Sequence, residues 1–199
     1  MSGSTRSCAP DRFALWLRRR VATPSRLLIA FLALTALPAI ALDAPALPPQ
    51  VIDIAPNLKV QGGGELTFFG ISVYDGFYWS PSRGWAQDGT FVLDLHYHRA
   101  LDGAKIAERS VSEISKLGYG SAEQHARWGN EMRRVFPNVK RGDRITGVNL
   151  PGGVVRYFYN GKPVGEIADP GFSQAFFGIW LDPRSSQQDF RQRLLGDKP

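Results

Sequence analysis

The chain has 199 residues, of which 43% are hydrophobic and 12% aromatic, and this length and composition fit one folded domain with a short additional segment. Its formal net charge of +6 is unevenly placed, because residues 1–41 hold six Arg against one acidic residue, which leaves about +1 for residues 42–199. A nearly neutral domain lacks the positive charge on which nucleic-acid binding depends, so we expect no nucleic-acid partner.

The first 41 residues are typical of a secretory signal. Residues 12–26 are basic, residues 27–41 (LLIAFLALTALPAIA) are almost entirely apolar, and Ala39-Ile40-Ala41 fits the small-x-small pattern before a signal-peptidase cut. We therefore expect cleavage after Ala41 and a periplasmic or secreted domain, with transient membrane contact through this segment only. The apolar run is shorter than the ~20 residues that span a bilayer, which disfavours a permanent transmembrane helix. An uncleaved membrane anchor is the alternative to a cleaved signal.

The only cysteine, Cys8, precedes the apolar run, so the exported part would contain no disulfide, no thiolate nucleophile and no cysteine ligand for a metal. Residues 42–57 are rich in Pro and Ala and are expected to form a linker. No repeat or second linker follows, and we predict one domain over residues 58–196.

Three strands are predicted before the first long helix. Residues 58–61 and 65–80 are expected to pair across a tight turn at Gly62-Gly63-Gly64. In residues 90–101, one set of side chains alternates with another in the period-two pattern of a half-buried strand. The two sets are Phe91, Leu93, Leu95 and Tyr97, and Val92, Asp94, His96 and His98.

Two amphipathic helices follow, over residues 103–118 and 121–136. Gly118 is expected to end the first helix, and Ser121 with Gln124 approaches a capping box at the start of the second. The second helix is expected to bury Ala126, Trp128, Met132 and Phe136.

Residues 144–150, 154–160 and 163–167 are predicted to form a three-stranded meander, with Asn160-Gly161 as a tight hairpin turn. Asp169-Pro170 is a helix start, and the helix over residues 172–181 carries a broad apolar stripe that must be buried. A last helix is expected over residues 185–195. The order favours an α+β fold, an antiparallel β-sheet with helices packed on one face.

The sequence offers little catalytic chemistry. It contains no G-x-S-x-G or S-x-x-K motif, and neither Asp94 with its neighbouring histidines nor Glu108 with Glu113 is distinguished from a solvated face. His96 and His98 could share a strand face and chelate a metal, but the sequence supplies no clear third ligand. We therefore assign no catalytic residue, no metal and no cofactor.

Arginines near tyrosines are the better candidates, because a guanidinium beside hydroxyls in an apolar cleft holds a carboxylate or phenolate. Arg99 ends a strand, Arg109 lies on the following helix, and Arg156 lies among aromatic residues. Pairing of these arginines with surface acids is the alternative. The predicted ligand contacts are Tyr74, Arg99, Arg109 and Tyr159.

Four stretches of the chain form a recognisable set: FFGISVYDGFYW, HYHRALDGAKIAERSVSEI, FPNVKRGDRITGVNLPGG and YNGKPVGEIADPGFSQAFFGIWLDPRSS. They resemble the bacterial chalcone-isomerase-like family, and the last stretch is the most specific. The resemblance covers about residues 58–196. It implies an open-faced β-sandwich, in which a layer of helices covers one large antiparallel sheet.

Plant chalcone isomerases, which cyclise chalcones to flavanones, are more weakly similar. Alignment places Pro56 or Asn57 at their catalytic arginine, Phe69 at their threonine, and Ile106 and Glu113 at their tyrosine and asparagine. None of the four is matched, so no catalytic residue carries over.

Non-catalytic relatives of the same fold bind fatty acids through an Arg and a Tyr. The leading hypothesis is therefore a non-catalytic protein that binds a small apolar or carboxylate ligand such as a fatty acid. The alternatives are an intramolecular lyase acting on an enone, with Arg99 or Arg109 replacing the absent arginine, and an interaction module of the cell envelope.

Overall fold

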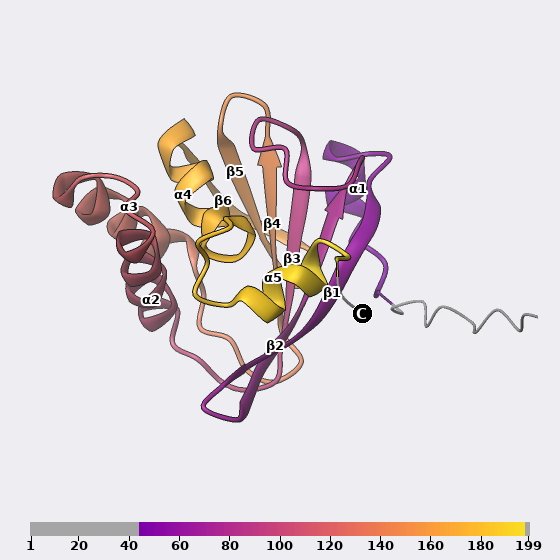
Figure 1. The fold of residues 1–199 in the computed structure, drawn as a ribbon, viewed down its shortest axis with the longest axis horizontal. Helices are drawn as coiled ribbons and strands as arrows, with labels where there is room; N and C mark the ends of the chain where they lie inside the picture. Colours follow the sequence, from indigo (N-terminus) through magenta and orange to yellow (C-terminus); the bar gives the residue numbers. More distant parts are fainter. Residues whose placement is uncertain (1–43, 198–199) are drawn as a thin grey trace, which may run out of the picture. The chain divides into compact units, whose positions relative to one another are not determined.

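The computed structural model describes residues 44–197 of the chain. Its helices and strands follow one another in the predicted order, with one additional helix at the start (Figure 1). They are α1 (Pro49–Ile54), β1 (Lys59–Phe68), β2 (Ile71–Ser80), β3 (Phe91–Tyr97), α2 (Gly103–Lys116), α3 (Ala122–Val135), β4 (Arg144–Leu150), β5 (Val154–Tyr159), β6 (Lys162–Ala168), α4 (Pro170–Leu181) and α5 (Gln188–Leu194).

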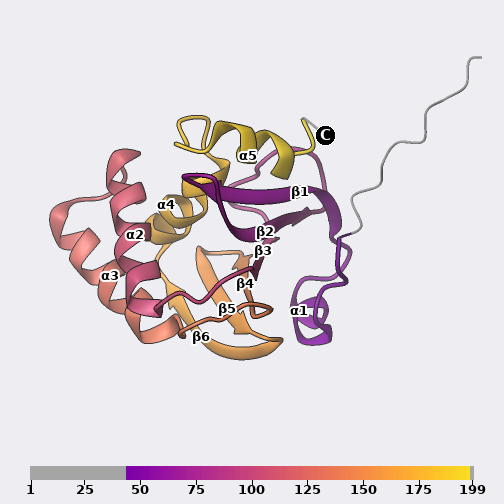
Figure 2. The same cartoon turned by 90° about the horizontal axis from the view of Figure 1, so that it is seen from below.

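The six strands form one sheet in the order β1-β2-β3-β4-β5-β6, and every neighbouring pair is antiparallel. Helices α2 to α5 cover one face of this sheet, whereas α1 lies against the other face (Figures 1 and 2). The predicted α+β class, an antiparallel sheet with helices on one face, is confirmed.

Each face of the sheet has its own core, as the alternation along β3 predicts. Phe91 and Leu93 pack in the large core under the helices, whereas Val92 belongs to a smaller core with Val51 of α1. Because side chains of a strand point alternately to the two faces, Asp94 shares the face of Val92. The cavity described below therefore lies on the side opposite Asp94.

Helix α4 is the central element of the large core. The Asp169 carboxylate accepts hydrogen bonds from the N–H groups of Gly171 and Phe172 at 2.9 and 3.2 Å, which caps the helix start as predicted. Phe172 to Leu181 are buried except for Gln174. The Phe177 ring lies 4.7 Å from that of Phe91 on β3, so α4 packs directly on the sheet.

The first hairpin differs from its prediction. Gly62 to Gly64 form no turn but lie inside β1, and the turn is at Phe69-Gly70. A Cβ atom on Gly62 would collide with the carbonyl oxygen of Arg193 in α5. Gly62 is thus required because α5 approaches the backbone of β1 closely at this point.

Two further expectations need correction. Residues 49–54, within the predicted linker, form α1, and Val51 is completely buried against the sheet. In the helix predicted over residues 121–136, Trp128, Met132 and Phe136 are buried as expected, but Ala126 is exposed.

The signal segment and its cleavage site lie outside the described residues. Within residues 44–197, no helix is long and apolar enough to cross a membrane.

Candidate functional site: an apolar cavity beneath helix α2

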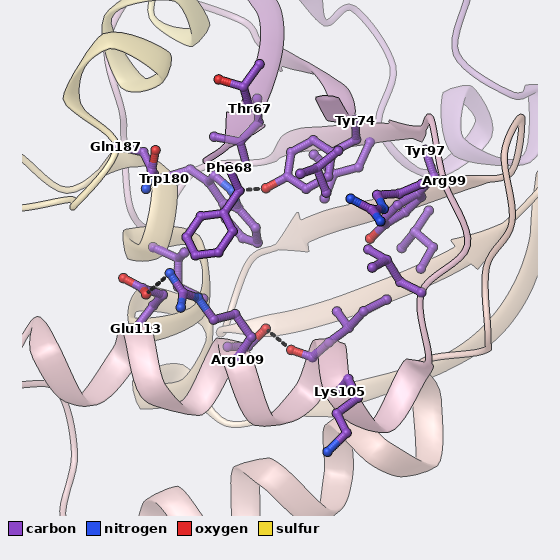
Figure 3. A pocket seen from close by; sticks show the side chains of 18 of the residues that line it. Thr67, Phe68, Tyr74, Tyr97, Arg99, Lys105, Arg109, Glu113, Trp180 and Gln187 are labelled. Carbon is purple, nitrogen blue, oxygen red and sulfur yellow. Dashed lines mark hydrogen bonds and ion pairs between the residues drawn. The ribbon is translucent and has the colours of Figure 1, made fainter. Parts of the chain in front are cut away.

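A cavity of about 350 Å³ lies between the helix-covered face of β1–β3 and helices α2 and α4 (Figure 3). The strands contribute Leu66, Tyr74, Leu95 and Tyr97 to its wall, and α4 contributes Phe176, Ile179 and Trp180. The wall is mostly apolar and aromatic, with a few polar groups. This composition is typical of a pocket for a small organic ligand.

The position of α2 explains why space remains here. Asp102 caps this helix by accepting hydrogen bonds from the N–H groups of Ala104 and Lys105 at 2.8 and 3.2 Å. From that start α2 packs mainly against α3 and α4 rather than against the strands. The inward side chains of Tyr74, Leu95 and Tyr97 are consequently not covered by α2, and they face the cavity.

Arg99 lines the cavity just beyond the end of β3, beside Tyr97 (Figure 3). It is exposed and forms no ion pair with any acidic side chain of residues 44–197. A guanidinium at an apolar cavity, without its own counter-ion, can receive an anionic group from a ligand.

Arg109 also lines the cavity, but its charge is already matched. Its Nη2 lies 2.7 Å from Oε1 of Glu113, one helical turn further along α2, and its guanidinium lies 5.0 Å from the centre of the Phe68 ring. Burial raises the pKa of Glu113, but hydrogen bonds from Lys116 and Ser186 and the Arg109 charge outweigh it, so the pKa lies below its ordinary value. Glu113 therefore stays ionised and holds Arg109.

Two tyrosines give the cavity neutral hydrogen-bond donors. The Tyr74 hydroxyl accepts a hydrogen bond from Trp180 Nε1 at 2.9 Å, which leaves its own proton available. The Tyr97 ring lies edge-on to that of Tyr74 at 5.6 Å. Burial raises the pKa of both hydroxyls, so both remain protonated at neutral pH.

Tyr74, Arg99 and Arg109 thus meet at one cavity, whereas Tyr159 is not among the residues that line it. The Tyr159 hydroxyl donates a hydrogen bond to Asp143 Oδ2 at 2.7 Å, and this bond raises the pKa of the tyrosine. Arg156 pairs with Glu166 at 2.9 Å, as the surface-pairing alternative predicted, and takes no part in the cavity.

Sequence reasoning did not choose several wall residues as ligand contacts, chiefly Tyr97, Lys105 and Trp180, and it considered Glu113 only as half of a carboxylate pair. A signal existed for Tyr97, which occupies an inward position of the predicted strand alternation. Glu113 stands four residues after Arg109, the spacing at which opposite charges on a helix pair. For Trp180, the apolar pattern predicted burial but could not predict a cavity beside it.

The histidine candidates and, apart from Glu113, the carboxylate candidates lie outside the cavity. His96 Nε2 is 2.8 Å from Asp94 Oδ2, and His98 Nε2 is 2.9 Å from Asp75 Oδ2. Within residues 44–197 no group of three or more His, Cys, Asp or Glu side chains is arranged to hold a metal ion. Glu108 pairs with Lys105 at 3.2 Å on the surface.

Comparison with solved structures agrees with this architecture. A crystal structure of a fatty-acid binding protein from Arabidopsis thaliana superposes with a TM-score of 0.56 at 15% sequence identity, covering 72% of this chain and 89% of that one. At that level of identity the likeness shows a shared fold.

Comparisons of sequence are more specific. An uncharacterized protein of Haemophilus influenzae is 28% identical over 137 residues, which cover 68% of this chain. The match spans 66% of that protein's length. The family model described as chalcone isomerase-like matches residues 54–196, which include the whole sheet, helices α2 to α5 and every residue of the cavity wall. The chain therefore belongs to the chalcone isomerase-like family.

Proposed function

We propose that this chain is an exported, non-catalytic protein that binds one apolar carboxylate, such as a fatty acid, in the cavity beneath α2. The observation that carries the proposal is Arg99, a cation without an acidic partner in residues 44–197, on the wall of an otherwise apolar, aromatic cavity. Export rests on the basic and apolar pattern of residues 12–41.

The cavity suits a ligand with one acyl chain. Its volume of about 350 Å³ is at the lower end of the range of about 300–1,000 Å³ for small-molecule pockets, which favours one chain over a two-chain lipid. The apolar wall would take the chain, and Arg99 with the protonated hydroxyls of Tyr74 and Tyr97 would take the carboxylate.

The name of the Arabidopsis neighbour, a fatty-acid binding protein, supports this proposal as an analogy of fold. Arg109 is the less suitable carboxylate receptor, because Glu113 already compensates its charge. A ligand carboxylate beside Arg109 would also meet the repulsion of Glu113.

The test compares palmitate with hexadecanol, which has the same chain but no charge, in displacing a fluorescent fatty acid from the purified protein. The wild type is expected to prefer palmitate, and Arg99→Gln to lose about tenfold in palmitate affinity because a charge-assisted hydrogen bond is lost. Arg133→Gln, which removes an exposed charge from α3, is the matched control and should leave the preference intact. Equal affinity of wild type for both ligands would contradict the proposal.

The enzyme alternative is tested with naringenin chalcone. Cyclisation in the presence of the protein is expected at the uncatalysed rate, since none of the four plant catalytic residues is matched and Arg109, one of the two arginines that could stabilise a phenolate, is held by Glu113. Turnover that depends on Arg99 or Arg109 would replace the binding proposal by an isomerase.

A further inference from the structure

The exposed large apolar side chains of the described domain gather at one place. Five such side chains are exposed within residues 44–197, and three of them lie within four consecutive residues: Phe68, Phe69 and Ile71. Phe69 is 90% exposed. We call residues 68–71, the turn between β1 and β2 at the lower end of the sheet in Figure 1, the hairpin tip. A contiguous apolar patch of this kind marks an interaction surface.

The fold itself does not require these residues. Phe69 and Gly70 have φ values of 49° and 73°, so both adopt the left-handed conformation of a two-residue turn. The same chain builds an equivalent turn from Asn160 and Gly161, with φ values of 48° and 80°. Asn tolerates this conformation, whereas phenylalanine is strained there. Phe69 thus adopts an unfavourable backbone conformation, and burial of its side chain does not offset the cost because the side chain is exposed.

The hairpin tip is also part of the cavity mouth. Phe68, Phe69 and Ile71 line the cavity while remaining exposed to solvent. In Figure 3 the Phe68 side chain extends from β1 toward Arg109 of α2, and the central carbon of that guanidinium lies 5.0 Å from the centre of the ring. A ligand that enters between the hairpin and α2 would therefore pass the tip.

Three exposed cations lie at the same end of the sheet. The Gly142 N–H donates a hydrogen bond to the Tyr97 carbonyl at 2.8 Å, which holds the turn containing Lys140 and Arg141 beside the end of β3 and Arg99. All three cations are exposed and form no ion pair within residues 44–197. The nearby Asp102 is occupied as the cap of α2, and Asp143 accepts the Tyr159 hydroxyl.

From this combination we propose that the hairpin tip docks on the surface of an anionic lipid bilayer and places the mouth of the cavity at the membrane. The rings of Phe68 and Phe69 would enter the interface, and Arg99, Lys140 and Arg141 would meet anionic headgroups. The docking explains why Phe69 is exposed and strained. It would also let an apolar ligand pass from the bilayer into the cavity, and this second point rests on the proposed function.

The experiment places a polarity-sensitive NBD fluorophore at the tip of the full chain. Phe69→Cys is labelled in a Cys8→Ser background, which removes the other cysteine. With vesicles of phosphatidylglycerol and phosphatidylcholine, and no fatty acid, the label is expected to shift to the blue and to become shielded from iodide. A label at Asp88→Cys, in the exposed loop at the other end of β2 and β3, is the control and should stay in water.

This design distinguishes membrane binding by the hairpin tip from membrane binding by the signal segment, residues 1–41. If the signal segment alone attached the chain to vesicles, both labels would remain in water, and that result would overturn the proposal. A blue shift without vesicles that grows with protein concentration would overturn it too, because a second copy of the chain would then cover the tip.

The electrostatic part is tested with Lys140→Gln and Arg141→Gln together, which leave the cavity wall unchanged. Each lost charge is expected to weaken binding to the anionic vesicles about fivefold, and the loss should shrink as salt is added. Unchanged binding would contradict docking through these cations. Failure of the docking proposal is distinguishable from failure of the proposed function. Palmitate binding is measured in solution without vesicles, whereas insertion of the hairpin tip is measured with vesicles and without a fatty acid.

Discussion

Asp94 is completely buried on the face of the sheet opposite the cavity. Its oxygens accept two hydrogen bonds from Arg144, at 2.7 and 2.6 Å, and one each from Thr146 and His96, at 2.7 and 2.8 Å. Burial raises the pKa of Asp94, but the bonds from His96 and Arg144 and the Arg144 charge outweigh it and keep the pKa below its ordinary value. The group thus serves the fold rather than a reaction.

Replacing Asp94 by Asn is expected to destabilise the protein by about 3 kcal/mol, because it leaves Arg144 largely buried without its carboxylate. Denaturant unfolding measures the loss. Glu108→Gln breaks the exposed pair with Lys105 and is the control, with an expected change under about 0.5 kcal/mol. Equal effects of the two substitutions would show that the buried pair contributes no more than a surface pair.

At the scale of the element, glycines of β1 and β2 lie where α5 comes close to the sheet. A Cβ atom on Gly62 would collide with the Arg193 carbonyl, and one on Gly76 would lie 2.5 Å from the Phe190 ring. Gly62→Ala is expected to displace α5 and to cost about 2 kcal/mol, within the range for overpacking. Gly147→Ala in β4 is the matched control, since its nearest atoms, in Tyr157 and Phe177, lie at ordinary contact distances of 3.5 to 3.6 Å.

Denaturant unfolding of Gly62→Ala and Gly147→Ala distinguishes close helix approach from a general intolerance of side chains in the sheet. If the two variants lost the same free energy of unfolding, the proximity of α5 would not be the reason for the glycine run. Hydrogen exchange of α5 gives an independent measure, because the Gly62 variant should lose protection there first.

The same elements show how far the sequence could predict the fold. Helix α4 was predictable because its signals are local: Asp169 caps it, Pro170 starts it, and nearly every following residue is apolar. The glycine run was misread as a turn because the helix that requires it, α5, lies far along the chain. The cavity was only partly predictable. Arg99 and Tyr74 were chosen by residue type, but which inward positions α2 leaves uncovered depends on how the helices pack on one another.

At the scale of the whole molecule, several ionisable groups make the free energy of unfolding depend on pH, and it is expected to fall at both acidic and alkaline pH. Hydrogen bonds from Arg184 hold the pKa of Asp182 well below its ordinary value, and Asp94, Glu113 and Asp169 are lowered as well. A depressed pKa means that the folded state favours the ionised form. This contribution is present above the unfolded pKa of about 4 and is lost as the pH falls toward the folded value.

The buried tyrosines act on the alkaline side. Burial raises the pKa of Tyr78 to about 12, and that of Tyr74, Tyr97 and Tyr157 above its ordinary value. Here the folded state favours the protonated form. Above the unfolded pKa of about 10 the unfolded chain loses protons that the folded chain keeps, so folding becomes less favourable as the pH rises.

We therefore predict a plateau of the unfolding free energy between about pH 5 and 9, with losses below about pH 4 and above about pH 10. Urea unfolding at pH 3, 7 and 11 measures all three regions. Because Asp94 contributes through its ionised form, the difference between wild type and Asp94→Asn should narrow as the pH falls from 7 to 3. A difference that stayed constant would mean that the pKa of Asp94 is the same in the folded and unfolded states, so that its ionised form contributes no stability of its own.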